Sequence, residues 1–266
     1  MVTLGVQWTR RTAVSLALLV AGALYAQRGF RVYDEEDNPA EIPADAGEKT
    51  EFVFGRLRYS SNRGGWRWGS WATDYPKADR QFLQGLRRLS RVHNRSMEQV
   101  VDIDSDEIYE YPWIYAVEVG RWGFSDSQAA RLREYLDRGG FLMVDDFHGE
   151  YEWETFLQGM QRVYPDRPIV DIEDSDEVFH VLYDLEHRFQ VPGVYTIYSG
   201  RTYEKGGIDP HWLGICDAKG RLVVAICHNM DLGDAWEWAD HPRYPENAAS
   251  LAYRVAISYI IYALTH

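Results

Sequence analysis

The chain has 266 residues, of which 45% are hydrophobic, and this composition excludes a largely disordered protein. Its formal net charge of −13 excludes non-specific binding to nucleic acids, which requires a basic surface. The length fits one large domain or two small ones, since a domain spans about 100–200 residues.

The first 26 residues have the pattern of a signal peptide. Arg10 and Arg11 precede a mostly apolar run over residues 12–26, which closes on a suitable cleavage sequence, Leu24-Tyr25-Ala26. This run is shorter than the roughly 20 residues of a membrane span. We therefore expect an exported bacterial protein, periplasmic or extracellular, with no integral span in its mature chain. Twin-arginine export and ordinary secretion both remain open, and an uncleaved anchor is the alternative.

Residues 27–49 have the composition of an acidic tether or arm. They carry Asp34-Glu35-Glu36-Asp37, two prolines and few apolar side chains. Without Arg10 and Arg11, the mature chain has 26 basic and 41 acidic residues, a net charge of −15. Such a charge fits a soluble exported protein and would attract cations.

Strand-like and helix-like segments alternate over residues 52–157, and this order predicts βαβ units around a parallel sheet. In the first strand, apolar side chains alternate with Arg56 and Arg58. Asp74 is expected to cap the first helix, and Ser125 opens a capping box before the second. The strands are expected at residues 52–59, 100–103, 113–119 and 141–144, and the helices around residues 82–89, 129–136 and 153–164.

The second half adds a β-hairpin, in which a turn at residues 217–220 joins two apolar strands. In that register Cys216 and Cys227 lie roughly 20 Å apart, because six residues of strand at about 3.3 Å each separate them. A disulfide needs Cα atoms within about 7 Å, so we expect two free, largely buried thiols. The other expected elements are strands at residues 168–172, 194–198, 212–216 and 222–227, a short helix at 176–183, an acidic tryptophan-rich loop at 232–244 and a buried helix after Pro245.

Together these segments predict one three-layer α/β domain over residues 50–266, with a mostly parallel central sheet. Its organising strand is Phe141–Val144, a continuous apolar run of the kind found in buried parallel strands. Asp145 and Asp146 follow at once. Because the carboxyl ends of parallel strands share one edge, the polar residues after each strand should meet there. The candidate ligand-binding residues of this edge are Arg58, Tyr59, Arg121, Asp145, Asp146, His148, His228 and Asp231.

The acids and histidines of this edge suggest two kinds of chemistry. Asp145, Asp146, His148 and His228, together with Asp231, are candidate ligands of a divalent metal through oxygen and imidazole. Asp145, Asp146 and His228 are also the catalytic candidates, because neighbouring carboxylates push their pKa values apart. The alternative is structural, since Asp at a strand end often caps a helix or accepts loop N–H bonds. No cofactor is predicted beyond this possible metal.

Two tryptophan-rich loops could form the walls of a ligand site at the same edge. Trp66 and Trp68 lie among glycines and serines, and Trp236 lies among acids. Exposed indoles stack on sugar faces or pack against a protein partner. The alternative is that these rings fold inward and cover the edge of the sheet.

Motifs for nucleophilic or nucleotide chemistry are absent from the sequence. Gly214–Ala218 surrounds Cys216, but a nucleophile elbow needs a turn into a helix, and here the chain turns into another strand. The sequence contains no G-x-S-x-G, no P-loop, no C-x-x-C and no G-x-G-x-x-G after a strand.

Several segments carry a resemblance to a known family. Gly139–Asp146, Leu132–Leu136, Tyr111-Pro112 and Tyr262–His266 together resemble the bacterial family called domain of unknown function 4159. The resemblance covers nearly all of the expected domain. It implies a flavodoxin-like, class I glutamine amidotransferase-like fold and an exported or membrane-attached protein. The amidotransferase cysteine has no counterpart, because the two acids after the organising strand stand in its approximate place.

Two functions remain open. The first is a non-enzymatic ligand-binding or protein-interaction module of the bacterial cell envelope, whose partner is an envelope protein or a carbohydrate. The second is a hydrolase, possibly metal-dependent, that acts on a carbohydrate or another envelope substrate through Asp145, Asp146 and His228.

Overall fold

The computed structural model describes residues 42–61 and 70–266 of the chain. The chain divides into two units, residues 1–47 and residues 48–266, and every element named below belongs to the second. The expected signal peptide, most of the expected acidic arm, and both Trp66 and Trp68 lie outside the described residues.

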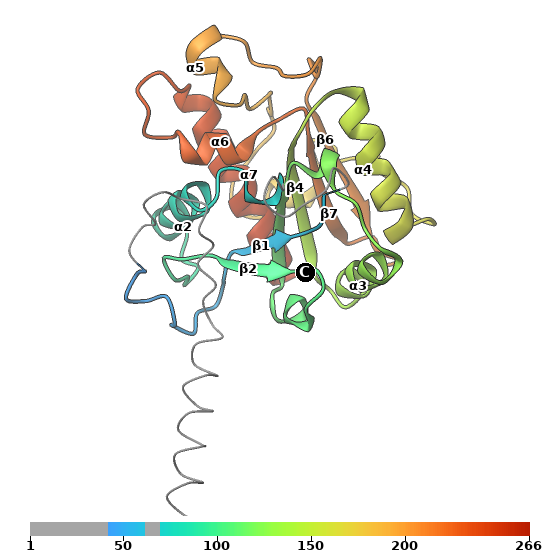
Figure 1. Cartoon of the computed structure of the whole chain (residues 1–266). Coiled ribbons are helices and arrows are strands. Elements are labelled where there is room, and N and C mark those ends of the chain that lie inside the picture. Colours follow the sequence, from blue (N-terminus) through green and yellow to red (C-terminus); the bar gives the residue numbers. More distant parts are fainter. Residues whose placement is uncertain (1–41, 62–69) are drawn as a thin grey trace, which may run out of the picture. The chain divides into compact units, whose positions relative to one another are not determined.

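Seven strands of the described residues form one sheet in the order β2-β1-β3-β4-β7-β6-β5. Neighbours from β2 to β7 are parallel, whereas β6 and β5 add an antiparallel edge. The parallel strands follow the flavodoxin-like order 2-1-3-4-5, with β7 in fifth place (Figure 1). The bounds are β1 (Gly55–Arg58), β2 (Gln99–Asp102), β3 (Trp113–Val117), β4 (Phe141–Phe147), β5 (Val170–Asp171), β6 (His211–Cys216) and β7 (Leu222–His228).

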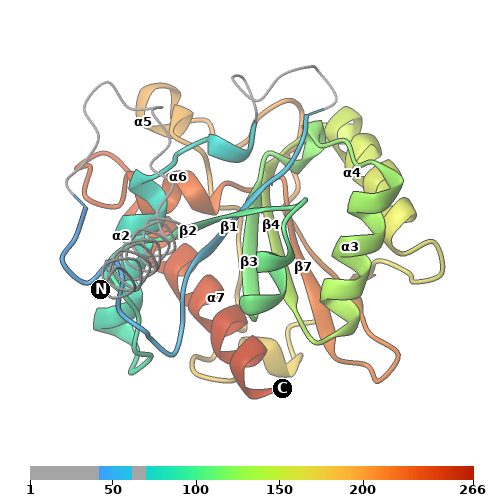
Figure 2. The ribbon, with the colours of Figure 1, turned by 60° about the horizontal axis from the view of Figure 1, so that its bottom comes forward.

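Helices cover both faces of the sheet, so the domain has three layers (Figure 2). On one face α2, α6 and α7 contact one another, and on the other face α3 contacts α4. The α-helices are α2 (Lys77–Leu89), α3 (Asp126–Asp137), α4 (Gly149–Val163), α5 (Tyr195–Ser199), α6 (Leu232–Glu237) and α7 (Glu246–Thr265). The 3-10 turns are η3 (Ser70–Ala72), η4 (Asp106–Glu110), η5 (Val119–Arg121) and η6 (Glu177–Phe179).

Two helices show how the sequence directs the layers. α3 begins at the predicted capping box, in which Gln128 N donates to Ser125 Oγ at 3.2 Å and Ser125 N donates to Gln128 Oε1 at 3.0 Å. α7 is apolar nearly all round, and Val255 and Ile260 are fully enclosed. By length and composition α7 could also cross a membrane, but 67% of its most apolar window is buried, as is common for the core helix of a folded domain.

The predicted hairpin and the two free thiols are confirmed. The hairpin consists of β6 and β7, and Cys216 lies opposite Leu222 while Cys227 lies opposite Trp212. The two cysteines therefore sit far apart along the ladder, and both are free. Cys227 is fully buried, and Cys216 is half-buried.

Three local predictions are wrong. The side chain of Asp74 does not cap α2, which follows Pro76 without a side-chain cap. Residues 194–198 form the single turn of α5 instead of a strand, and Gly200 ends that turn with a φ of 69°. The loop expected over residues 232–244 begins with α6, because Asp231 accepts a hydrogen bond from the backbone of its first turn.

Arg56 also departs from the predicted alternation of β1. Its side chain is fully buried between the sheet and α2, on the same face as Phe54. The guanidinium is neutralised there by Asp79 of α2, with Nη2 2.5 Å from Oδ1. The alternation within one strand does not show whether an arginine is exposed or buried in an ion pair. The acidic partner comes from another element of the chain.

Candidate functional site

The carboxyl ends of the parallel strands bring acidic residues to one edge of the sheet. Glu118 follows β3, Asp146 lies near the end of β4, and Asp231 follows β7. Asp74 joins them from the loop between η3 and α2. Between β1 and β3 the strand order also reverses, which is where such sheets usually bind ligands.

Five aspartates form what we call the carboxylate cluster. One oxygen from each of Asp74, Asp146 and Asp231 lies within 4.8 Å of the other two. An oxygen of Asp74 also lies within that distance of Asp234, and Asp145 is bonded to the backbone immediately after Asp231. Within the described residues, the groups with this spacing contain neither His148 nor His228.

Asp145 ties β4 to the start of α6. Its Oδ2 accepts hydrogen bonds from the Tyr115 hydroxyl at 2.9 Å and from the N–H groups of Leu232 and Gly233 at 2.7 and 3.0 Å. Burial raises the pKa of Asp145 to about 7, although these hydrogen bonds act in the opposite direction. The other oxygen, Oδ1, is buried and has no hydrogen-bond partner.

Asp146 is paired with His148. The carboxylate Oδ1 lies 3.1 Å from the imidazole Nε2, while Nδ1 of the same ring is buried without a partner. Burial, followed by the charge of Lys205, lowers the pKa of His148 to about 3. The imidazole is therefore neutral at physiological pH and supplies no positive charge to Asp146.

Asp231 and Asp234 are positioned by backbone N–H groups. Asp231 Oδ1 accepts from Asp234 N at 2.7 Å and so caps α6, and Asp234 Oδ2 accepts from Val194 N at 2.5 Å. The cap fixes Asp231 beside the end of β4. The two side chains thus join the loop after β7 to the loop that leads into α5.

The carboxylates repel one another where little water can reach them. Burial, followed by the charge of Asp234, raises the pKa of Asp74 well above its usual value. Burial also raises the pKa of Asp146, with Glu118 next in effect, and that of Asp231, with Asp234 next in effect. No lysine or arginine within residues 42–61 and 70–266 pairs with Asp74, Asp146 or Asp231. Protons or a bound cation must neutralise this site.

The backbone is strained around the same edge. Asp74, Glu118, Asp146 and Asn229 have φ values of 62°, 51°, 51° and 63°. Asp and Asn enter this left-handed region more readily than other residues, but each such residue still costs about 1–3 kcal/mol. Strain of this kind concentrates at functional sites, where the surrounding structure holds it in place.

A second feature of this edge is a pocket of about 470 Å³ that we call the aromatic pocket. It is lined by Trp153 of α4, His211 of β6 and His228 of β7, with Glu150 and Asp209 among its charged residues. The volume lies within the range of about 300–1,000 Å³ that is usual for small-molecule sites. Gly149, the residue after His148, also lines it, so the aromatic pocket and the carboxylate cluster are neighbours.

His228 lies in the aromatic pocket and not in the carboxylate cluster. Its ring centroid is 4.7 Å from that of Trp153 and 5.6 Å from that of His211, and the two imidazoles are nearly parallel at 14°. Its Nε2 lies 3.4 Å from the carbonyl oxygen of Gly149. Burial lowers the pKa of His228 to about 4, and its ring contacts those of Trp153 and His211 along one wall of the pocket.

Two of the predicted edge residues are engaged in structural contacts. Arg58 forms an ion pair with Asp102 of the neighbouring strand β2. The hydroxyl of Tyr59 donates to the carbonyl oxygens of Val117 and Glu118 at 2.6 and 3.0 Å, and its ring is buried. Both residues hold the edge together and do not line the aromatic pocket.

Arg121 and Trp236 lie in different surroundings from each other. Arg121 of η5 is half-exposed and pairs with Glu118 at 2.6 Å and with Glu152 at 3.8 Å, so it reaches the outer side of the acidic edge. Trp236 is fully buried in the core, with its ring centroid 4.7 Å from that of Phe82. The loop around Trp236 therefore folds inward, which was the alternative considered for the tryptophans.

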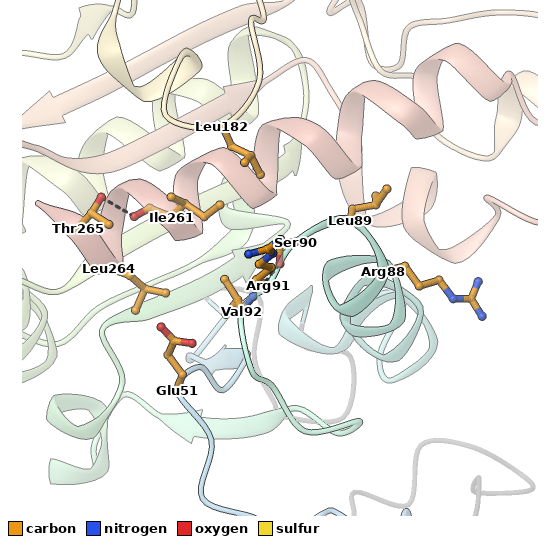
Figure 3. A pocket seen from close by; sticks show the side chains of 10 residues that line it. All are labelled: Glu51, Arg88, Leu89, Ser90, Arg91, Val92, Leu182, Ile261, Leu264 and Thr265. Carbon is orange, nitrogen blue, oxygen red and sulfur yellow. Dashed lines mark hydrogen bonds between the residues drawn. The ribbon is translucent and has the colours of Figure 1, made fainter.

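Another cavity, of about 650 Å³, is unrelated to these residues (Figure 3). It lies between the C-terminal ends of α2 and α7 and is lined by Leu89, Val92, Leu182 and Leu264. Glu51, which precedes β1, closes one side, so this cavity lies at the amino ends of the strands. The candidate site is at the opposite edge.

Sequence reasoning missed four residues of the site. Asp74 and Asp234 complete the carboxylate cluster, and Trp153 and His211 complete the aromatic pocket. Trp153 fits the apolar stripe of its helix, and nothing in the local pattern separates it from core residues. The left-handed backbone of Asp74 is the feature that distinguishes it from a helix cap, and backbone angles are not visible in a sequence.

Comparison with protein families gives a match. No curated protein matches the chain at a significant level. The family described as Domain of unknown function (DUF4159) matches residues 53–264, which include the whole sheet, the carboxylate cluster and the aromatic pocket. The match covers well over half of the chain, and the chain therefore belongs to the DUF4159 family.

Proposed function

We propose that the chain is a non-enzymatic ligand-binding module of the bacterial cell envelope, and that it binds a carbohydrate in the aromatic pocket. The observation that carries this proposal is the wall of rings formed by Trp153, His228 and His211. Glu150 and Asp209 in the same pocket supply carboxylates. Ring faces pack against the C–H faces of a sugar, while carboxylates accept hydrogen bonds from its hydroxyl groups.

The compartment is proposed from the N-terminal sequence. Residues 1–26 have the pattern of an export signal, and the mature chain is strongly acidic. Envelope glycans are abundant in the compartment to which such a signal leads. An envelope protein is the other class of partner that an aromatic and acidic surface would suit.

Binding of the full-length chain to soluble fragments of envelope glycans tests the proposal. In isothermal titration calorimetry, Trp153→Ala should weaken binding about tenfold or more, because a lost ring contact of about 1.4 kcal/mol equals a factor of ten. His211→Ala should weaken it as well. Tyr151→Ala is the matched control, since Tyr151 is exposed on α4 and does not line the pocket.

Two results would count against carbohydrate binding. One is the absence of binding to any glycan fragment by the unmodified chain. The other is equal binding by the Trp153→Ala and Tyr151→Ala proteins, which would place the ligand outside the aromatic pocket.

A hydrolase is the second candidate, because Asp146 and His148 form a buried acid–base pair beside the pocket. The neutral imidazole of His148 has a free Nδ1 that can accept a proton, and the carboxylate can orient the ring. His228 would then contact substrate in the pocket and take no part in the proton transfer.

The hydrolase is tested by measuring release of new reducing ends from the same glycans. Asp146→Asn should lower any activity by about 10²-fold or more, the usual effect of losing acid–base assistance. Asp171→Asn, on the exposed edge strand β5, should leave activity unchanged. An activity that Asp146→Asn does not affect would exclude this pair as its source.

A further inference from the structure

The carboxylate cluster carries buried negative charge, and this charge raises a question of ligand binding separate from that of the aromatic pocket. Asp74, Asp146 and Asp231 come from three different segments, and one oxygen of each lies within 4.8 Å of the others. All three oxygens are carboxylate oxygens, and none of the three residues is paired with a lysine or arginine within the described ranges. Three like charges at this spacing repel one another, and a bound cation or protonation relieves the repulsion.

Within the described residues, the two cations that act on Asp74 and Asp146 already have ion-pair partners. Arg56 is held by Asp79, and both are fully buried. Lys205 Nζ lies 2.9 and 3.0 Å from the two carboxylate oxygens of Glu152. Each cation lowers the pKa of its neighbouring aspartate, yet the pKa of Asp74 and of Asp146 stays raised.

Unpartnered buried oxygens point to an ion that occupies the cluster. Asp74 Oδ2 is enclosed and accepts no hydrogen bond, although the residue as a whole is partly exposed. Oδ1 of the fully buried Asp145 also has no partner. A buried acceptor normally finds a donor, and an oxygen left without one costs about 1–3 kcal/mol, more when it is charged. A cation bound among Asp74, Asp146 and Asp231 would give Asp74 the positive partner that it lacks, whereas Asp145 belongs to no group with this spacing among the described residues.

Two glycines bring the backbone close to the cluster. A Cβ on Gly233 would lie 2.8 Å from Asp74 Oδ2, and a Cβ on Gly193 would lie 3.0 Å from Asp231 Oδ2 and 3.2 Å from Asp234 Oδ2. Any other residue at these positions would press on the carboxylates. The backbone of both glycines therefore lies close to the carboxylates, and at Gly193 the Glu204 carboxylate is closer still, 2.5 Å from the position of an added Cβ.

We infer that Asp74, Asp146 and Asp231 form a binding site for a hard divalent cation, of which Ca²⁺ fits best. Carboxylate oxygens without sulfur or imidazole favour Ca²⁺, Mg²⁺ or Mn²⁺ over softer metals. Ca²⁺–O distances of about 2.3–2.6 Å place opposite ligands up to about 5 Å apart, whereas Mg²⁺ requires about 4.2 Å. Oxygens within 4.8 Å of one another lie inside the limit for Ca²⁺. Asp234 is the next carboxylate in reach.

The test uses the full-length chain, stripped of metal with EDTA and titrated with CaCl₂, MgCl₂ and MnCl₂ separately. Thermal unfolding and calorimetry should show one Ca²⁺ site. At free Ca²⁺ of 100 times the dissociation constant, the folded-to-unfolded ratio should rise about 100-fold. Asp74→Asn and Asp231→Asn should lose this response, and Asp171→Asn should keep it.

A second measurement separates metal binding from a purely structural role. Without metal, Asp74→Asn should melt at the same temperature as the unmodified chain or higher, because one of the repelling charges is gone. A structural carboxylate would give the opposite result, a lower melting temperature. Asp231→Asn keeps a side-chain oxygen that can cap α6.

Three results would overturn the inference. These are the absence of a response to all three metals, a response that both Asn variants retain, and a lower metal-free melting temperature of Asp74→Asn with the Ca²⁺ response intact. None of them bears on carbohydrate binding, since the glycan titration depends on Trp153 and is carried out in EDTA as well as in Ca²⁺.

Discussion

Arg56 holds the loop that carries Asp74. Its Nε and Nη2 donate to Asp79 at 3.0 and 2.5 Å, and its Nη1 lies 3.3 Å from the carbonyl oxygens of Trp71 and Thr73. A single buried guanidinium therefore joins β1, α2 and the segment just before Asp74. Arg56 is a positioning residue for the carboxylate cluster, although it touches none of the five aspartates that form it.

Asp79→Ala should destabilise the protein by about 3–5 kcal/mol, because it leaves the guanidinium of Arg56 buried and unpaired. The double variant Arg56→Met with Asp79→Leu should recover much of this loss, since apolar residues of similar size replace a buried pair well. Urea unfolding measures both effects. Equal stability of the single and double variants would show that the ion pair is not the source of the loss.

At the level of single residues, the sequence predicts where a side chain lies in the fold better than it predicts which groups that side chain contacts. Asp145, Asp146 and Asp231 were expected at the carboxyl edge of the sheet, and all three lie there. Their partners could not be foreseen, because Tyr115 and Asp74 come from distant segments and reach the edge only in the folded chain.

α4 packs closely against η5 and the segment after it through two glycines. A Cβ on Gly159 would lie 2.3 Å from Nε1 of Trp122, and a Cβ on Gly120 would lie 2.3 Å from Cβ of Glu152. Trp122 is fully enclosed and stacks on Phe156 with ring centroids 5.2 Å apart. The contact places α4 at a fixed distance from the sheet, and with it Trp153 of the aromatic pocket.

Gly159→Ala should destabilise the protein by about 1–3 kcal/mol, the usual effect of inserting a methyl group into a packed core. This exceeds the gain of about 1 kcal/mol that alanine normally brings over glycine inside a helix. Gln158→Ala, at the exposed neighbouring position, is the control and should change stability little. If Gly159→Ala raised the midpoint of urea unfolding, Trp122 would have to be free to move.

At the level of elements, long periodic segments were predicted well and short ones poorly. The apolar run of β4, the capping box of α3 and the apolar α7 each carry a strong local signal, and all three occur. α5 and α6 have only five and six residues, too few for a helical period to appear. A glycine after α5 ends that helix, and an aspartate before α6 caps the start of the other.

For the whole molecule, alternation of strands and helices predicted a three-layer domain, and the parallel sheet confirms it. The strand order was implied by the family resemblance and is the flavodoxin-like order. Separation of the edge into a carboxylate cluster and an aromatic pocket could not be predicted. The separation depends on the direction in which side chains point after each strand. A register shift between β4 and β7 changes that direction.

The spread of the cluster along the chain has a mechanical consequence. Asp74, Asp146 and Asp231 belong to segments far apart in sequence, and the two cysteines of the chain are too distant to cross-link it. An ion shared by these three carboxylates would cross-link the three segments, as a disulfide does in many exported proteins. The stability of the fold would then follow the calcium content of the surroundings and not their redox state.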